Sequence, residues 1–403
     1  MSSFRLALAN LLHDQTRTAV SVVGAAFAVV LIFMQLGFLG AVKDSAILLF
    51  DRLDFDVLLT SREYLDMSRP GTLPRARLAQ ARAAGGVAEV HPVSVGAGLW
   101  RTPLDQGATA GKRWPITILG IDPGTVPRVF EPADRGGVLD KDDRDHHQRL
   151  LGRLNVVLLD RRSRPDFGQP YDPSKPGQPG MPPGQMVELN GQMVELAGYF
   201  DLGTGFSYSG LLITNEETFG QLTGRSKNMV TFGLVRAEPG VDPADLAARI
   251  EQTLPSDTRA YTRDELNRQE QDFWVNATAA GQFFTFGVIL AVFVGGIFIY
   301  QMMVADIKKH LPEYATLKAV GYRFPYLFWV VVWQSVYLAV AGFGIGLVMA
   351  LILYELTRQA ANFPIAMNLQ RMALVLTLTV GMCVGSGLLA VRKVRTANPA
   401  DLF

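Results

Sequence analysis

The sequence predicts a membrane protein with four transmembrane α-helices and a large α+β extracytoplasmic domain between the first and the second helix. Three observations support this fold class. Hydrophobic residues make up 49% of the 403 residues and charged residues only 19%, a smaller charged share than soluble domains usually have. Four stretches without Asp, Glu, Lys or Arg are long enough to cross a bilayer. The long segment between the first two of them is charged and rich in turns.

The four predicted spans are residues 18–42, 277–305, 324–354 and 372–391. Crossing about 30 Å of hydrocarbon takes roughly 20 helical residues. The first span is longer than the apolar region of a secretory signal, about 7 to 15 residues, so we expect it to be retained. No span contains an acidic or basic side chain, whereas ion-coupled carriers usually keep such groups near the middle of the membrane. We therefore expect the energy for any transport to come from outside the spans.

Lys and Arg in short connecting segments predict the orientation, because such segments stay in the cytoplasm. Arg5 and Arg17 precede the first span, and basic residues also mark two further segments: Lys308, Lys309, Lys318 and Arg323, then Arg392, Lys393 and Arg395. Residues 1–17, 306–323 and 392–403 are therefore expected to be cytoplasmic. Residues 43–276 and 355–371 are expected on the other side.

The large domain shows signals for both strands and helices. Strands are predicted at residues 56–60, 87–95, 114–121 and 211–214, and helices at residues 74–84, 242–254 and 262–274. We expect the last helix to run without a break into the second span. Proline and glycine density predicts an irregular loop over residues 161–185.

A hexapeptide, GQMVEL, occurs twice, at residues 184–189 and 191–196. The two copies flank Asn190 and Gly191, which together favour the positive φ angles of a type I′ turn. The duplication therefore predicts a β-hairpin.

The sequence contains no recognisable catalytic constellation. Residues 107–112 (GATAGK) lack the glycine spacing of a phosphate-binding loop, and neither HExxH nor GxSxG occurs. Cys383 is the only cysteine and His91 has no evident partner. One cluster combines acids and histidines: Asp142, Asp143, Asp145, His146 and His147. It is either a metal site or a solvated charged loop, and the lack of a defined ligand spacing favours the loop. We expect this chain to bind no metal or cofactor and to catalyse no reaction.

Residues 310–322, HLPEYATLKAVGY, predict a short helix between the second and third spans. Pro312 suits the first helical turn, Glu313 complements the positive helix dipole, Lys318 suits the last turn and Gly321 supplies a stop. This helix either enters a groove of a partner through Tyr314 and Leu317 or only anchors at the lipid surface.

Two further features suggest helix contacts. A second interfacial helix at the N-terminus is predicted from an apolar face that comprises Phe4, Leu8, Leu11 and Leu12. Small residues four apart allow close helix packing, either within one subunit or at a dimer seam. These pairs are Gly342 with Gly346 and Gly381 with Gly385.

Three long segments carry a resemblance to a known family: YTRDELNRQEQDFWVNAT (residues 261–278), YQMMVADIKKHLPEYATLKAVGY (300–322) and VRKVRTANPADLF (391–403). Here the chain resembles the permease family that includes MacB, FtsX and the Lol transporters, and most closely its DevC-type branch. The resemblance implies a porter-like α+β part with a second insertion, a homodimer, and a coupling helix that contacts the ATPase. That helix corresponds to Pro312, Glu313, Tyr314, Ala315, Thr316, Leu317, Lys318 and Gly321.

The resemblance also implies partners. MacB has an ATPase domain fused at its N-terminus and this chain does not, so the expected ATPase is a separate subunit that binds ATP and magnesium. DevC-type systems imply a periplasmic membrane-fusion (adaptor) protein, a TolC-like outer-membrane channel and a place in the bacterial inner membrane. Net charge of +1 gives no reason to expect nucleic acid.

Two functions fit this resemblance. The first is the permease of a tripartite exporter that drives efflux of an amphiphilic substrate such as a glycolipid, peptide or drug. The alternative is an FtsX-like regulator that activates a periplasmic cell-wall hydrolase and transports nothing.

Overall fold

The computed structural model describes residues 3–13, 15–130, 144–172, 180–205, 208–309, 324–361 and 365–395. The chain divides into two compact units. One, the membrane unit, comprises Met1–Ala41 and Ala279–Phe403; the other, the α+β domain, is Val42–Thr278. Four helices are long and apolar enough to span a membrane: Thr18–Ile47, Ala279–Ala305, Phe328–Gln359 and Leu369–Leu389. The predicted fold class, four such helices with a large α+β domain after the first, is therefore confirmed.

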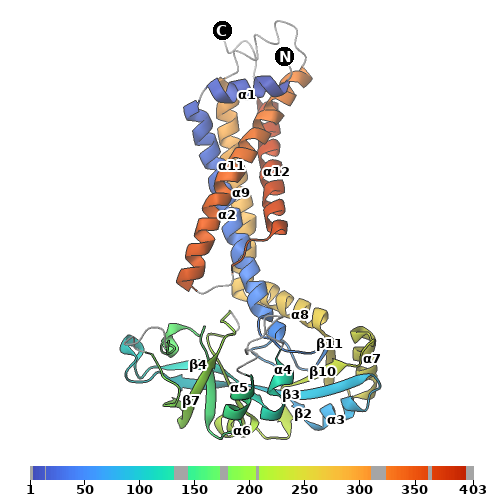
Figure 1. Cartoon of the computed structure of the whole chain (residues 1–403). Helices are drawn as coiled ribbons and strands as arrows, with labels where there is room; N and C mark the ends of the chain where they lie inside the picture. Colours follow the sequence, from blue (N-terminus) through green and yellow to red (C-terminus); the bar gives the residue numbers. More distant parts are fainter. Residues whose placement is uncertain are drawn as a thin grey trace. The chain divides into compact units, whose positions relative to one another are not determined.

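The membrane unit is a helix bundle (Figure 1). Its elements are α1 (Ser3–His13), α2 (Gln15–Ile47), α9 (Ala279–Lys309), α11 (Phe324–Ala361) and α12 (Leu369–Arg395). Buried apolar side chains fill the bundle interior, among them Val29, Ile32, Phe33, Ala291, Ala350 and Val375. Large apolar side chains also point outward along α9: Phe283, Phe286, Ile289, Leu290 and Phe293. A helix that is apolar all round is stable only in a core or in a bilayer.

Half of the α+β domain is a split βαβ fold. It contains β1 (Val57–Ser61), α3 (Ala76–Arg82), β3 (Val87–Arg101), β10 (Phe232–Ala237), α7 (Pro243–Thr253) and β11 (Thr258–Thr262). The strands are antiparallel in the order β11-β1-β10-β3, which is the order of a ferredoxin-like βαββαβ unit. Alternate strand residues such as Val57 and Leu59 face the buried side of α3 and α7, which presents Leu78, Leu246 and Ile250.

The other half is inserted between β3 and β10. It contains β4 (Arg113–Ile121), α4 (Val126–Val129), α5 (Arg144–Leu151), β5 (Val156–Asp160), β6 (Gln185–Leu189), β7 (Gln192–Phe200), β8 (Leu211–Asn215) and α6 (Glu216–Thr223). The sheet continues as β3-β4-β8-β5-β7-β6, and β6 pairs back onto β3 through Trp100↔Leu189. The six strands therefore close on themselves around a core that contains Trp100, whose indole Nε1–H donates to the carbonyl of Phe167 at 2.8 Å.

The remaining elements are short, except for α8 (Arg263–Asn276), which ends the domain. They are the two-stranded sheet β2 (Leu73–Pro74) and β9 (Met229–Val230) and the 3-10 turns η1 (Phe50–Arg52), η2 (Gly107–Thr109), η3 (Pro123–Thr125) and η5 (Pro165–Phe167).

The predicted hairpin is confirmed. Leu189 pairs with Gln192 across the turn, and Asn190 (φ 52°) and Gly191 (φ 78°) both have the positive φ that a type I′ turn requires. The Asn190 side chain also accepts from the Leu99 N–H at 2.7 Å and donates to the Leu222 carbonyl at 2.8 Å, so the turn is fixed to the rest of the domain.

Most predicted elements occur with shifted ends. The strand predicted at 87–95 extends to Arg101 because its first half pairs with β10 and its second half with β4 and β6. The predicted loop at 161–185 is irregular in its described part apart from η5 and a bridge between Pro170 and Met181.

Three expectations were wrong. The helix predicted at 262–274 does not run into the second span: α8 ends at Asn276 and α9 begins at Ala279, and the Thr278 hydroxyl donates to the Trp274 carbonyl at 2.6 Å, which is the acceptor that a continuing helix would use. Residues 144–151 form the helix α5, not a solvated loop, because buried His147 packs there and bonds the Tyr199 carbonyl at 3.1 Å. His91 does have a partner, since its Nε2 lies 2.7 Å from Glu89 Oε2.

Candidate coupling and transmission elements

The predicted coupling helix lies outside the described residues. α9 ends at Lys309 and α11 begins at Phe324, so the structure gives no geometry for Pro312, Glu313, Tyr314, Ala315, Thr316, Leu317, Lys318 and Gly321. Their coupling role stays a prediction from the sequence.

The N-terminal helix α1 lies against α11, and Figure 1 shows it running across the end of the bundle. The Phe4 ring contacts Trp333 (centroids 5.2 Å apart) and Tyr337 (5.3 Å). Leu11 packs against the bundle, and its carbonyl accepts from the Thr18 hydroxyl at 2.7 Å. The apolar face of α1 is therefore divided between protein contacts and the exposed side chains of Leu8 and Leu12.

The first glycine pair allows α11 to approach α2. A Cβ built on Gly342 would lie 2.5 Å from the Ala25 Cβ, and one built on Gly346 would lie 2.6 Å from Val29 Cγ1 and 2.9 Å from the Ala26 carbonyl oxygen. Real side chains do not come this close, so the helix spacing requires glycine at both positions.

The second glycine pair is different. A Cβ on Gly381 or Gly385 would meet no described atom within 4 Å, and the same holds for Gly344 on α11. These positions are open in the described part of the subunit. The structure thus brings Gly342 and Gly346 to α2 and places Gly381 and Gly385 away from the described neighbours of α12.

The helix α2 also contacts the other spans. A Cβ on Gly37 would lie 2.4 Å from the Tyr354 hydroxyl oxygen, and that hydroxyl donates to the Phe33 carbonyl. A Cβ on Gly295 of α9 would lie 2.8 Å from the Ala28 Cβ. Because α2 is packed so closely on α9 and α11, it cannot shift without moving both helices or breaking these contacts.

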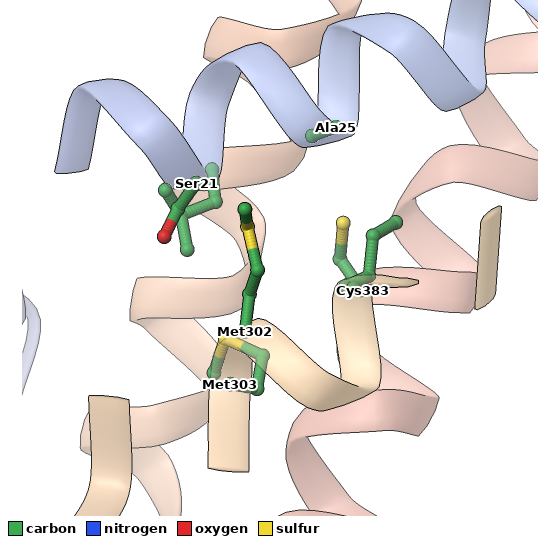
Figure 2. Close-up of a pocket in the computed structure, with 7 residues that line it drawn as sticks. Ser21, Ala25, Met302, Met303 and Cys383 are labelled. Atoms are coloured by element: carbon green, nitrogen blue, oxygen red, sulfur yellow. The ribbon is translucent and has the colours of Figure 1, made fainter. Parts of the chain in front are cut away.

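A small cavity lies inside the bundle (Figure 2). It measures ≈ 10 Å³ and is lined by Ser21, Ala25, Ile299, Met302, Met303, Leu338 and Cys383. A volume of this size holds about one water molecule. The cavity is far too small and too apolar to be a route for a solute.

The helix α8 is anchored to its own domain at the N-terminal end. Arg263 donates to three backbone carbonyls, those of Phe50 (2.9 Å), Leu53 (2.8 Å) and Phe55 (3.0 Å), and its guanidinium lies 4.3 Å from the centre of the Phe55 ring. Thr262 and Glu265 form a reciprocal capping box at the same end. α8 is therefore fixed to the segment that follows α2 in the chain.

A second anchor of α8 is a cluster of buried titratable groups. Tyr64, Asp66 and Glu270 are at most 3% exposed, and the Tyr64 hydroxyl donates to Glu270 Oε1. Burial, reinforced by the negative charge of Asp66, raises the pKa of Glu270 to about 7. Burial and the neighbouring Glu270 also raise the pKa of Tyr64.

Two clefts on the α+β domain are lined by both charged and apolar side chains. One, of ≈ 250 Å³, is lined by Asp122, Pro123, Leu151, Gly152, Leu154, Asn215, Glu216, Glu217 and Lys227, and the other, of ≈ 230 Å³, by Arg75, Leu78, Ala79, Arg82, Val90, His91, Pro92, Asp122 and Thr125. Arg75 pairs with Glu216 at 2.5 Å and Lys227 with Glu217 at 3.3 Å. The charged residues in both linings suit contacts with polar groups of a partner.

The described residues contain no group of three or more His, Cys, Asp or Glu side chains that could hold a metal ion. Of the cluster for which a metal site was considered, Asp142 and Asp143 lie outside the described residues, while Asp145, His146 and His147 lie on α5.

Reasoning from the sequence did not single out Glu270 or Arg263. A signal for Glu270 was available, because it follows Leu266 by four residues and so lies on the same face of the predicted helix. The side chains of Leu266 and Glu270 are both fully buried. An acid on the buried face of a helix is uncommon enough to be noticed.

Comparison with protein families gives two matches. The MacB-like periplasmic core domain matches residues 18–253, more than half of the chain, and the FtsX-like permease C-terminal region matches residues 285–399. An uncharacterized ABC transporter permease protein of Mycobacterium tuberculosis is 30% identical over 113 residues, which are 27% of this chain and 12% of that protein. The chain thus spans only a small part of the length of this relative.

Two solved structures are also similar in part. One is the periplasmic region of MacB from Actinobacillus actinomycetemcomitans. The matched part is 53% of this chain and 90% of the MacB chain, at 13% sequence identity and a TM-score of 0.34. The other is the extracellular domain of the noncanonic ABC-type transporter YknZ from Gram-positive bacteria. The matched part is 52% of this chain and 100% of the YknZ chain, at 14% sequence identity and a TM-score of 0.33.

Proposed function

Because the chain belongs to the MacB/FtsX family of ABC-type permeases, we propose that it is the permease subunit of an exporter and transmits motion from a separate ATPase to its α+β domain. The family implies an ATPase partner, since the function of an ABC permease depends on one. The proposed exporter acts on an amphiphilic substrate such as a glycolipid, peptide or drug.

The observation that supports this proposal most strongly is the apolar, closely packed membrane unit. The apolar stretches of the four spans, residues 18–42, 277–305, 324–354 and 372–391, contain no acidic or basic residue, so they offer no charged site for a coupling ion. The cavity beside Cys383 has room for about one water molecule. A bundle of this kind is suited to transmitting force, while the cargo takes a route outside it.

The contacts within the membrane unit suggest a path for that force. Residues 306–323 and α1 are the proposed receivers of ATPase movement. Phe4 connects α1 with α11 through Trp333 and Tyr337, and Gly342 and Gly346 connect α11 with α2. α2 then continues as one helix to Ile47. Movement at the cytoplasmic ends would reach α2 through side chains already in contact.

The proposed assembly follows the DevC-type branch of the family. It consists of two copies of this chain in a bacterial inner membrane with both termini in the cytoplasm, a separate ATP- and magnesium-binding ATPase, a periplasmic membrane-fusion protein and a TolC-like channel. The two clefts lined by Glu216 and by Arg75 would face polar surfaces of such partners.

Gentle purification of the tagged chain from its native membranes, followed by mass spectrometry, tests the assembly. Recovery of an ATPase together with a membrane-fusion protein is the expected result. An ATPase with a peptidoglycan hydrolase or its activator would favour the FtsX-like regulator instead. Recovery without any ATPase would contradict both functions.

The coupling prediction is tested by Glu313→Gln and Leu317→Ala. We expect the stimulation of the ATPase rate by substrate to fall at least about tenfold in each variant. The melting temperature should stay unchanged, because only the partner contact is removed. Matched controls are Glu355→Gln and Leu356→Ala, which change the same residue types at exposed positions of α11. Normal coupling in both coupling-helix variants would refute the assignment.

A further inference from the structure

The buried cluster of Tyr64, Asp66 and Glu270 joins two parts of the α+β domain. Tyr64 and Asp66 lie on the segment after β1, and Glu270 lies in the middle of α8. Asp66 and Glu270 are both 0% exposed. Each carboxyl has one bonded oxygen: Asp66 Oδ1 accepts from the backbone N–H and hydroxyl of Ser68, and Glu270 Oε1 accepts from the Tyr64 hydroxyl.

The second oxygen of each carboxyl, Asp66 Oδ2 and Glu270 Oε2, is buried without a hydrogen-bond partner. No Lys, Arg or His in the described part of the chain forms an ion pair with either carboxyl. Tyr261 of β11 lies near them, with its ring 6.3 Å from that of Tyr64. Two donors beside Glu270, the Met67 N–H and the Trp274 indole, lower its pKa, but burial raises it by more. Two buried acids without a cation cannot both carry a full negative charge at low cost.

We propose that Asp66 and Glu270 form a proton-binding site that holds one proton, and that this proton keeps α8 seated on the α+β domain. The proton resides on Glu270, because burial and the charge of Asp66 raise the pKa of Glu270. This site requires no transported substrate and is independent of the proposed exporter function.

The direction of the pH effect follows from linkage. Burial, together with the charge of Asp66, raises the pKa of Glu270 from 4.5 to about 7. The seated helix therefore binds more protons than a displaced helix with an exposed Glu270. The contribution of this proton to the stability of the seated helix is complete below pH 4.5 and is lost as the pH rises to and through 7. A difference of this size favours displacement of α8 by up to about 300-fold at alkaline pH.

Infrared difference spectroscopy of the full chain in lipid nanodiscs, titrated between about pH 5 and 9, tests the proposal. We expect the carbonyl band of a protonated carboxyl to disappear near neutral pH. The band should be absent in Glu270→Gln, shifted to a lower midpoint in Asp66→Asn and unchanged in Asp272→Asn, an exposed acid on the same helix. A band that persists in Glu270→Gln, or no titrating band in the wild type, would overturn the proposal.

Hydrogen exchange of residues 263–276, corrected for the intrinsic pH dependence of exchange, tests the seating of α8. Exchange should rise by up to about 300-fold between pH 4.5 and 7 in the wild type and level off above pH 7, and it should stay flat in Glu270→Gln, which retains the neutral form of the side chain. Equal pH dependence in both proteins would overturn the seating role. If millimolar calcium or magnesium lowers the midpoint, the pair binds a cation in place of the proton and the proposal is wrong.

Discussion

The contact between α11 and α2 yields a prediction with a matched internal control. Gly346→Ala places a Cβ within 2.6 Å of Val29 Cγ1, 2.7 Å of Val29 Cβ and 2.9 Å of the Ala26 carbonyl oxygen. Val29 is β-branched and has one strongly preferred rotamer in a helix, and the carbonyl belongs to the backbone, so neither can give way locally. The helices must separate.

Gly344→Ala is the control, because a Cβ there meets no described atom within 4 Å. Both substitutions gain the same helix propensity, about 0.5 to 1 kcal/mol. The difference between them therefore isolates the overpacking cost, about 1 to 3 kcal/mol. We expect Gly344→Ala to be neutral or slightly stabilising and Gly346→Ala to be less stable than Gly344→Ala by that amount.

Unfolding of the full chain in mixed micelles by increasing SDS, followed by circular dichroism, measures this difference. The ATPase rate of the assembled complex shows whether the same contact matters for transmission, since a wider gap should lower it. Free energies of unfolding that agree within about 0.5 kcal/mol for the two variants would refute the reasoning, because the predicted overpacking cost exceeds that value.

Two further predictions concern α8. Arg263→Ala should lower the free energy of unfolding of the α+β domain by about 2 to 4 kcal/mol, because three carbonyls lose a charged donor. Arg263→Lys should recover less than half of that free energy, since an ammonium cannot reproduce the planar guanidinium fork. Chemical denaturation of both variants measures this, and a fully stable Lys variant would contradict the three-carbonyl geometry. Glu270 holds a proton only in the folded state, so it should contribute a fall of up to about 3 kcal/mol in the free energy of unfolding between pH 4.5 and 7, and Glu270→Gln should reduce the measured pH dependence by that amount.

The architecture of the membrane unit was predictable from the sequence. Lipid requires long apolar helices, and the four runs without charged residues satisfy that requirement locally, so their positions depend on nothing distant in the chain. The hairpin at Asn190 and Gly191 was predictable for a similar reason. Its turn depends on the φ preferences of two neighbouring residues, and the repeated strand residues on each side set the register.

The break between α8 and α9 was not predictable in the same way. α8 ends at Asn276 and α9 begins at Ala279, in a stretch that includes Asn276 and Thr278, two weak helix formers. The Thr278 hydroxyl bonds the Trp274 carbonyl there, but the same bond occurs inside unbroken helices, for example from Thr285 to Gly281, so this contact did not make the break predictable.

The sequence by itself determined the membrane class, the number of spans, the hairpin and the charge-free stretch inside each span, because each depends on local composition or on neighbouring residues. Only the tertiary structure decided that Gly346 meets Val29 while Gly344 meets nothing, and that Glu270 lies buried near Asp66, 204 residues earlier in the chain. Contacts of this kind depend on how distant segments fold together. The pKa of an acid, and the space beside a glycine, are set by those segments and not by the residues on either side.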